Sequence, residues 1–154
     1  DRPIPPEVSV RGHEHLLGES TLSVFAAPAL AERLRGDFPR LLDGAPFLLP
    51  GEDVAHRGAL LQWFERMRIR PAIVAEFDDS ALMKAFGQAG DGVFAAPNTI
   101  ADHVCRQYGV RVLGEVPEAR ARVYAITTER RLSHPAMQAI HSAAARALTP
   151  AAAG

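Results

Sequence analysis

Two carboxylates and a hydroxyl stand side by side at Asp78, Asp79 and Ser80. They follow a predicted strand over residues 72–77 and precede an amphipathic helical pattern that ends at Gly90. In α/β proteins, small ligands bind where strands end and helices begin. Oxygen ligands also suit hard cations, so Asp78 and Asp79 are possible sodium ligands. The simpler interpretation is that Asp79 or Ser80 caps the helix while Asp78 favours its positive end. The two interpretations are compatible.

Other reactive side chains form no catalytic pattern. His13 and His15 would point to the same side of a strand and could meet one zinc ion, but the spacing indicates no third ligand. The single cysteine, Cys105, excludes an internal disulfide and a multi-cysteine zinc site. The sequence has no G-x-S-x-G elbow, dinucleotide-binding glycine motif, P-loop or H-E-x-x-H motif. This pattern favours binding over catalysis, and we expect neither an enzyme nor a cofactor.

The surrounding elements alternate between strand and helix. Strands are predicted over residues 21–26, 45–49, 72–77, 93–96, 110–113 and 122–127, whereas residues 1–20 carry poor signals of either kind. Helices are expected to begin at Pro28, Asp53, Ser80, Pro97 and Pro135. Four alternations with short connections predict an α/β fold, a doubly wound and mostly parallel sheet with flanking helices.

Composition narrows the setting. The 154 residues are 47% hydrophobic, enough for one domain or two small lobes, and the net charge of −1 provides no basic field for nucleic acid. Neither a membrane span nor a signal peptide is recognisable, so the expected location is cytoplasmic. The start at Asp1, without methionine, indicates a piece of a longer protein.

Four segments carry a family resemblance: GESTLSVFAAP, PFLLPG, LLQWFERMRIRPAIVAEFDDSALMKAFGQAGDGVFAAP and RVYAITTERRLSHPAMQAI. Together they resemble the effector-binding domain of LysR-type transcriptional regulators. The resemblance is most specific over residues 77–86 and 129–135, and it is strongest to the sodium/proton-antiporter regulator subgroup.

The resemblance implies a domain organisation. Members carry an N-terminal DNA-binding domain and two lobes like those of type II periplasmic binding proteins. Residues 1–20 would be the end of the first lobe and the hinge, and residues 21–118 the complete second lobe. Residues 119–148 would be the return strand and helix of the first lobe, and residues 149–154 a tail. DNA would be contacted only through the N-terminal domain, which this chain lacks.

The resemblance also implies a function. An effector would sit between the lobes and contact residues near strand ends: Asp78, Asp79, Ser80, Phe94, Pro97, Tyr124 and His15. The effector would be a small molecule or a monovalent cation, and the regulator would activate an antiporter gene in response to sodium, lithium or pH. Members assemble as dimers or tetramers, here through the helix expected over residues 53–68. The alternative is a stand-alone cytoplasmic small-molecule-binding module or a small α/β enzyme.

Overall fold

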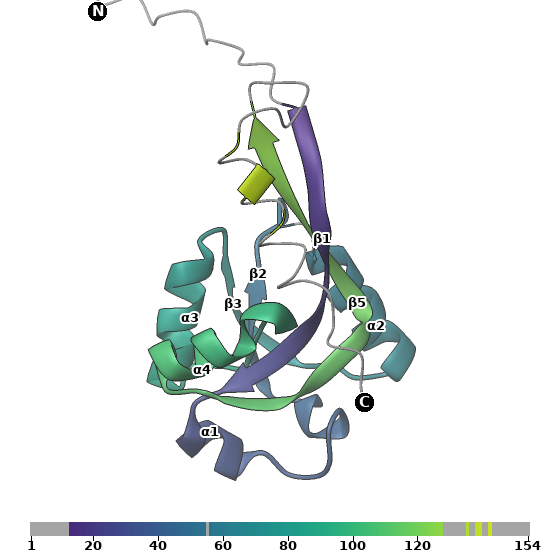
Figure 1. The fold of residues 1–154 in the computed structure, drawn as a ribbon. Coiled ribbons are helices and arrows are strands. Elements are labelled where there is room, and N and C mark those ends of the chain that lie inside the picture. The colour runs from purple at the N-terminus through teal and green to yellow at the C-terminus, as the bar shows by residue number, and fades with distance from the viewer. Residues whose placement is uncertain (1–12, 55, 128–134, 136–137, 140–141, 143–154) are drawn as a thin grey trace, which may run out of the picture. The chain divides into compact units, whose positions relative to one another are not determined.

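The computed structural model describes residues 13–54, 56–127, 135, 138–139 and 142. The chain divides into two compact units, one formed by Asp1–Gly18 with Val123–Gly154 and the other by Glu19–Arg122. Two strands, β1 (His13–Ala26) and β5 (Arg111–Thr127), run from one unit into the other (Figure 1).

The second unit contains the elements between these two strands. In chain order they are α1 (Pro28–Arg33), η1 (Arg40–Leu42), β2 (Pro46–Pro50), α2 (Arg57–Met67), β3 (Ala72–Phe77), α3 (Ser80–Ala89), β4 (Phe94–Pro97), η2 (Asn98–Ile100) and α4 (Ala101–Tyr108). The predicted alternation of strands and helices is confirmed.

The strands form a two-stranded sheet, β2–β3, and a three-stranded sheet, β4–β1–β5, which one parallel bridge connects. β2 and β3 are parallel, in register from Pro46 opposite Ala72 to Pro50 opposite Phe77. A parallel bridge joins Phe47 to Val93, the residue before β4, where the Val93 N–H donates to the Pro46 carbonyl at 2.7 Å. β4 then pairs antiparallel with β1, and β5 lies on the other side of β1. The carboxyl ends of β2, β3 and β4 therefore lie at one edge.

Two strand predictions were wrong in extent. Residues 13–20, which carry poor local signals, belong to β1. The strands expected over residues 110–113 and 122–127 are parts of the single strand β5. Because β1 and β5 are neighbours in the sheet, their ladder extends both strands past the point where local sequence preference supports them.

Two helix starts also differ from the prediction. Asp53 does not cap α2, because consecutive turns, Val54 N–H to Gly51 carbonyl and Arg57 N–H to Val54 carbonyl, delay the helix until Arg57. Pro97 ends β4 and is the N-cap of η2, which leads directly into α4, so the helical segment begins one residue later than expected. The helix expected to begin at Pro135 lies mostly outside the described residues. The four residues of this segment that are described are helical: Pro135, Gln138, Ala139 and Ser142.

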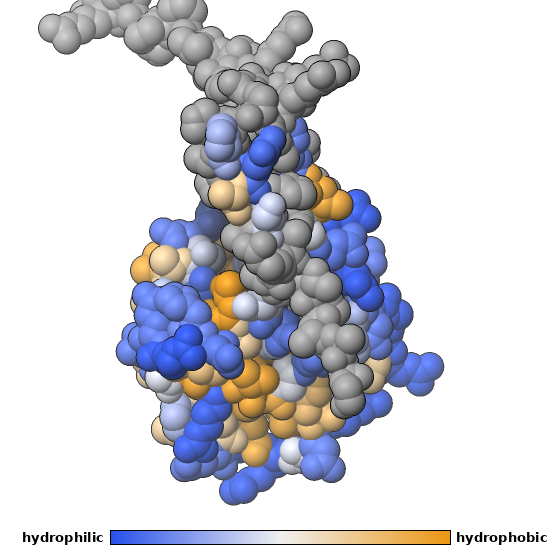
Figure 2. All heavy atoms as spheres, in the orientation of Figure 1, coloured by the Kyte–Doolittle hydropathy of each residue, from blue (hydrophilic) through white to orange (hydrophobic). Residues whose placement is uncertain are grey.

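The sheet separates two hydrophobic clusters because neighbouring strand residues point to opposite faces. Figure 1 shows α2 on one side of the sheet and α3 with α4 on the other. One cluster packs strand residues Leu22, Val24, Phe47, Leu49, Val93 and Ala95 with Leu60, Trp63 and Phe64 of α2. The other packs Phe25, Leu48, Phe94 and Ala96 with Met83 of α3 and Val104 of α4. In Figure 2, hydrophilic side chains cover α4, and hydrophobic residues gather between α4 and β5.

Candidate functional site

A cavity of about 310 Å³ lies at the edge where the parallel strands end. It is lined by Pro50, Val54, His56, Phe77, Ser80, Met83, Lys84, Ala95, Ala96, Pro97 and Ile100. We call it the strand-end cavity. Pro50, Phe77 and Pro97 are the last residues of β2, β3 and β4, and Ser80 is the first residue of α3. The position matches the ligand edge expected from the sequence, and the lining is apolar except for three side chains.

Asp79 caps α3. Its Oδ1 accepts hydrogen bonds from the Ala81 N–H at 2.7 Å and the Leu82 N–H at 3.2 Å, so the capping interpretation is confirmed. The helix ends at Gly90, whose φ of 87° lies in the left-handed region, as the sequence predicted. Asp79 is exposed and is not part of the cavity lining.

Asp78 lies against the backbone of Gly51. A Cβ atom built on Gly51 would fall inside van der Waals contact with the Asp78 carboxylate, so a larger residue at this position would displace the Asp78 side chain. The Gly51 N–H donates to the Phe77 carbonyl at 2.7 Å, which holds the chain after β2 close to the end of β3. Asp78 is exposed and does not line the cavity either.

His56 and Lys84 supply the ionisable groups of the lining. The Nε2 of His56 is buried and has no hydrogen-bond partner among the described residues. Burial, and secondarily the nearby Lys84 ammonium, lower the pKa of His56 below 6.5, so the imidazole is neutral at pH 7. Lys84 is half-buried and forms no ion pair within the described residues. The charged group of the lining is therefore a cation.

Sequence reasoning missed both residues, for different reasons. Lys84 follows Ser80 by four positions, so helical spacing puts the two side chains on one face and could have identified it. His56 reaches the cavity through the two turns that delay α2, and no sequence signal marks those turns.

Arg57 ties the start of α2 to the ends of two strands. Its guanidinium donates to the Pro50 carbonyl at 2.6 Å and to both carboxylate oxygens of Glu76, at 2.9 and 3.3 Å. Since Pro50 and the neighbouring His56 line the cavity, this fork positions that wall.

The remaining sequence candidates are scattered. Pro97 lines the cavity, whereas Phe94 is fully buried and stacks on Phe25 with ring centroids 5.3 Å apart. His15, in β1, and Tyr124, in β5, belong to the other unit. His15 is half-buried, and the Tyr124 side chain lies outside the described residues.

The described residues outside the cavity offer little further site chemistry. Within the described residues, no three His, Cys, Asp or Glu side chains gather closely enough to hold a metal ion. Cys105 is half-buried and packs against the cluster beneath α4. Among the described helices, none has the length and apolar character needed to cross a membrane.

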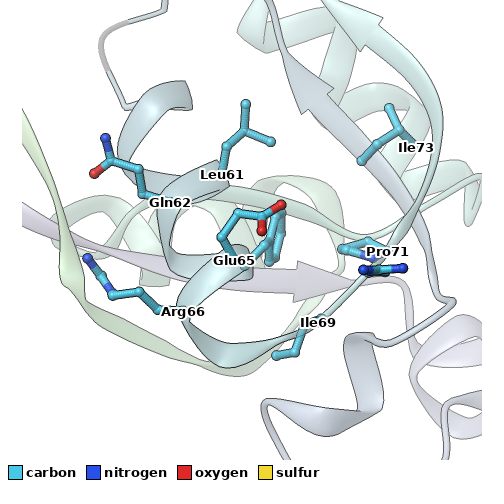
Figure 3. A pocket seen from close by; sticks show the side chains of 9 residues that line it. Leu61, Gln62, Glu65, Arg66, Ile69, Pro71 and Ile73 are labelled. Atoms are coloured by element: carbon cyan, nitrogen blue, oxygen red, sulfur yellow. The ribbon is translucent and has the colours of Figure 1, made fainter.

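A second hollow, wide open and about 840 Å³, lies between α2 and β3. It is lined by Leu61, Gln62, Phe64, Glu65, Arg66, Ile69, Arg70, Pro71 and Ile73, and we call it the α2–β3 groove. Figure 3 shows Leu61 of α2 and Ile73 of β3 on its two sides. Both are exposed, Leu61 by 36% and Ile73 by 42%. Within the described residues, β3 pairs only with β2, which leaves the other edge of β3 unpaired.

The sequence is similar to one protein family and to known transcriptional activators. The family model described as "LysR substrate binding domain" matches residues 5–149. The transcriptional activator protein NhaR of Escherichia coli K12 is 37% identical over 103 residues, which cover 67% of this chain and 34% of that protein. NhaR of Shigella flexneri gives the same values. The chain thus spans about a third of the length of these relatives.

Solved structures share the fold. The regulatory domain of HypT from Salmonella typhimurium aligns with a TM-score of 0.64 at 16% identity, over 86% of this chain and 66% of that one. The effector-binding domain of QuiR in complex with shikimate aligns with a TM-score of 0.58 at 19% identity, over 91% and 66%. These likenesses show the periplasmic-binding-protein-like fold. Domains of this kind are regulatory effector-binding modules and not enzymes. The chain belongs to the LysR substrate-binding domain family.

Proposed function

We propose that this chain senses the effector of a cytoplasmic transcriptional activator that controls a sodium/proton antiporter gene. The observation that carries the proposal is the strand-end cavity, formed where β2, β3 and β4 end and α3 begins. The 37% identity to the activator NhaR supports the choice of target gene. The expected input is a change in sodium, lithium or pH, and DNA is contacted by a domain outside this chain.

The domain organisation predicted from the sequence remains part of this proposal. We assign residues 21–118 to a complete second effector lobe, and residues 1–20 with 119–148 to parts of the first lobe and the hinge. Of the predicted effector contacts, Ser80 and Pro97 line the strand-end cavity. Asp79 caps α3 beside it, the Asp78 carboxylate lies against Gly51, and Phe94 is buried in the core. His15 and Tyr124 are proposed as contacts from the first lobe.

Narrowing the cavity tests this proposal. Ile100 lines the cavity and is 38% exposed, so Ile100→Trp adds bulk there. Val112→Trp, at a residue 46% exposed on β5 and outside the cavity, is the matched control. In the full-length regulator, we expect Ile100→Trp to reduce effector-dependent transcription several-fold while operator binding stays unchanged. A full response in Ile100→Trp, or equal losses in both variants, would contradict the proposal.

Whether sodium or lithium is the effector can be tested by thermal unfolding of this chain. A ligand that binds only the folded state raises its melting temperature. If the cation itself is the effector, sodium or lithium chloride should raise the melting temperature more than potassium chloride does at equal ionic strength. Equal melting temperatures in the three salts would assign the sodium response to another signal.

We also propose that the α2–β3 groove is where a second copy of the regulator docks. The exposed side chains of Leu61 and Ile73, together with the unpaired edge of β3, support this assignment. Ile73→Glu places a charge in the groove, and Val112→Glu places one at a matched exposed site outside it. By sedimentation, we expect only Ile73→Glu to shift the full-length regulator towards smaller species. If Ile73→Glu left the assembly of the regulator unchanged, the groove would not be part of the interface between copies.

A further inference from the structure

We propose that the strand-end cavity binds a small organic anion, a monocarboxylate with an apolar body, whose carboxylate pairs with Lys84. The inference rests on the proposed function, which makes this cavity the effector site, and it deepens that function by naming the class of ligand. It also assigns any sodium response to something other than coordination inside the cavity.

The charge of the lining is the first argument. Lys84 is the chain's single lysine, it lines the cavity, and no carboxylate pairs with it within the described residues. No acidic residue lines the cavity. Ser80 begins α3, so the positive end of this ten-residue helix faces the same region as the ammonium group. A half-buried, unpaired cation attracts an anion and repels sodium.

The two acidic residues beside the cavity do not supply a counter-charge to its lining. The Oδ1 of Asp79 accepts two backbone N–H groups of α3, and the Asp78 carboxylate lies against Gly51. Both side chains are exposed and lie outside the lining. Asp79 therefore serves as a helix cap, and within the described residues neither carboxylate forms an ion pair with the Lys84 ammonium.

The other polar groups suit a carboxylate. The Ser80 hydroxyl can donate one hydrogen bond. The buried Nε2 of His56 lacks a partner, and a neutral imidazole with a proton on Nε2 can donate another. A carboxylate has two oxygens and accepts several hydrogen bonds, so one such group could satisfy all three side chains.

Size and apolarity define the rest of the ligand. The cavity of about 310 Å³ is at the small end of the roughly 300–1,000 Å³ range of ligand pockets. Eight of its residues are apolar, among them Phe77, Met83 and Ile100. A compact hydrocarbon or aromatic group fits such walls better than a sugar or a nucleotide does, because polar hydroxyls would be left without partners.

The single lysine gives a direct assay. Protein grown with carbon-13 lysine has one Cε–Hε signal in an NMR spectrum, and that signal reports on Lys84. We would titrate the chain with benzoate and with benzamide, which has the same shape without the charge, and separately with sodium and potassium chloride. We expect benzoate to shift the signal saturably, benzamide to bind at least ten-fold more weakly, and sodium to act no differently from potassium.

Two variants isolate the contact. Lys84→Gln removes the ammonium, and benzoate binding, followed by calorimetry, should weaken at least ten-fold. Arg106→Gln removes one positive charge at an exposed position of α4, outside both the cavity and the α2–β3 groove, and should leave benzoate affinity unchanged. Equal losses in the two variants would mean that net charge, and not Lys84, governs binding, which would overturn the inference.

The outcomes separate this inference from the proposed function. Equal affinities for benzoate and benzamide would show that the cavity binds ligands without selecting a negative charge. That result would refute the proposal of an anionic ligand. If the NMR signal of Lys84 shifted with sodium and not with potassium, the proposal of an anionic ligand would be refuted, and a cation would be the ligand instead. If neither carboxylate nor amide binds, the inference fails, and the effect of Ile100→Trp on transcription then decides independently whether the cavity is the effector site.

Discussion

Gly87 sets how closely α3 lies on the sheet, and replacing it tests the geometry of the strand-end cavity. A Cβ atom at Gly87 would come closer than 3.0 Å to the ring of Phe94, a distance that real Cβ atoms essentially never show. Phe94 is fully buried and stacks on Phe25, so its ring has no free space to enter. Gly87→Ala must therefore push α3 away from β4, and α3 carries Ser80 and Lys84.

The magnitude follows from two opposing terms. Alanine is favoured over glycine inside a helix by roughly 0.5–1 kcal/mol. Overpacking a filled core costs roughly 1–3 kcal/mol. We expect a net destabilisation of about 1 kcal/mol for Gly87→Ala. Gly58→Ala, in α2 with open space around its Cβ, should instead stabilise by up to about 1 kcal/mol. The opposite signs make the pair a matched control.

Urea unfolding measures both changes. The single tryptophan, Trp63, is buried in α2, and its fluorescence reports on unfolding. We also expect Gly87→Ala to weaken ligand binding in the cavity, since α3 moves, and Gly58→Ala to leave it unchanged. Phe94→Leu should relieve the clash, so the double variant with Gly87→Ala should be more stable than the sum of the single changes predicts. Stabilisation by Gly87→Ala, or strict additivity with Phe94→Leu, would refute the reasoning.

Three further predictions concern the surroundings of the cavity. Asp79→Ala removes the cap of α3 and should lower the free energy of unfolding by about 1 kcal/mol. Asp79→Asn keeps an acceptor and should lower it by only a few tenths of a kcal/mol. Urea unfolding distinguishes the two variants. Because burial, then Lys84, lower the pKa of His56 below 6.5, the unfolded chain binds that proton more readily. Stability that is complete above pH 6.5 should thus fall as the pH drops below it, and thermal unfolding of His56→Gln should show a shallower fall. Arg57→Ala breaks the fork to Glu76 and should lower the melting temperature more than Arg66→Ala does, at an exposed position of the same helix; equal shifts would contradict this role of the fork.

Local sequence patterns predicted well those features that depend on neighbours in the chain. The cap at Asp79, the left-handed end at Gly90 and the strand over residues 72–77 all follow from residues within one or two turns of each other. Physical rules for caps, glycine and alternation act over the same short range, which is why the sequence is enough to apply them.

Features that depend on distant contacts were not predictable in this way. The extent of β1 and β5 follows from their pairing, which joins segments far apart in the sequence. The place of His56 depends on two backbone turns, and that of Arg57 on a bond to Glu76, nineteen residues later. A histidine without a recognisable spacing partner looks like any surface residue until the fold gives it neighbours.

Capping and ligand binding are easily confused at the start of α3, because both use a side-chain oxygen of Asp79. Loss of effector response in Asp79→Ala is expected under either role, since Lys84 lies on the helix that the cap holds. Asp79→Asn separates them: the amide oxygen still accepts the backbone N–H groups, but the negative charge that would bind a cation is gone. If the response survives in Asp79→Asn and fails in Lys84→Gln, the acidic turn serves to position the helix, and the recognised charge is on the effector.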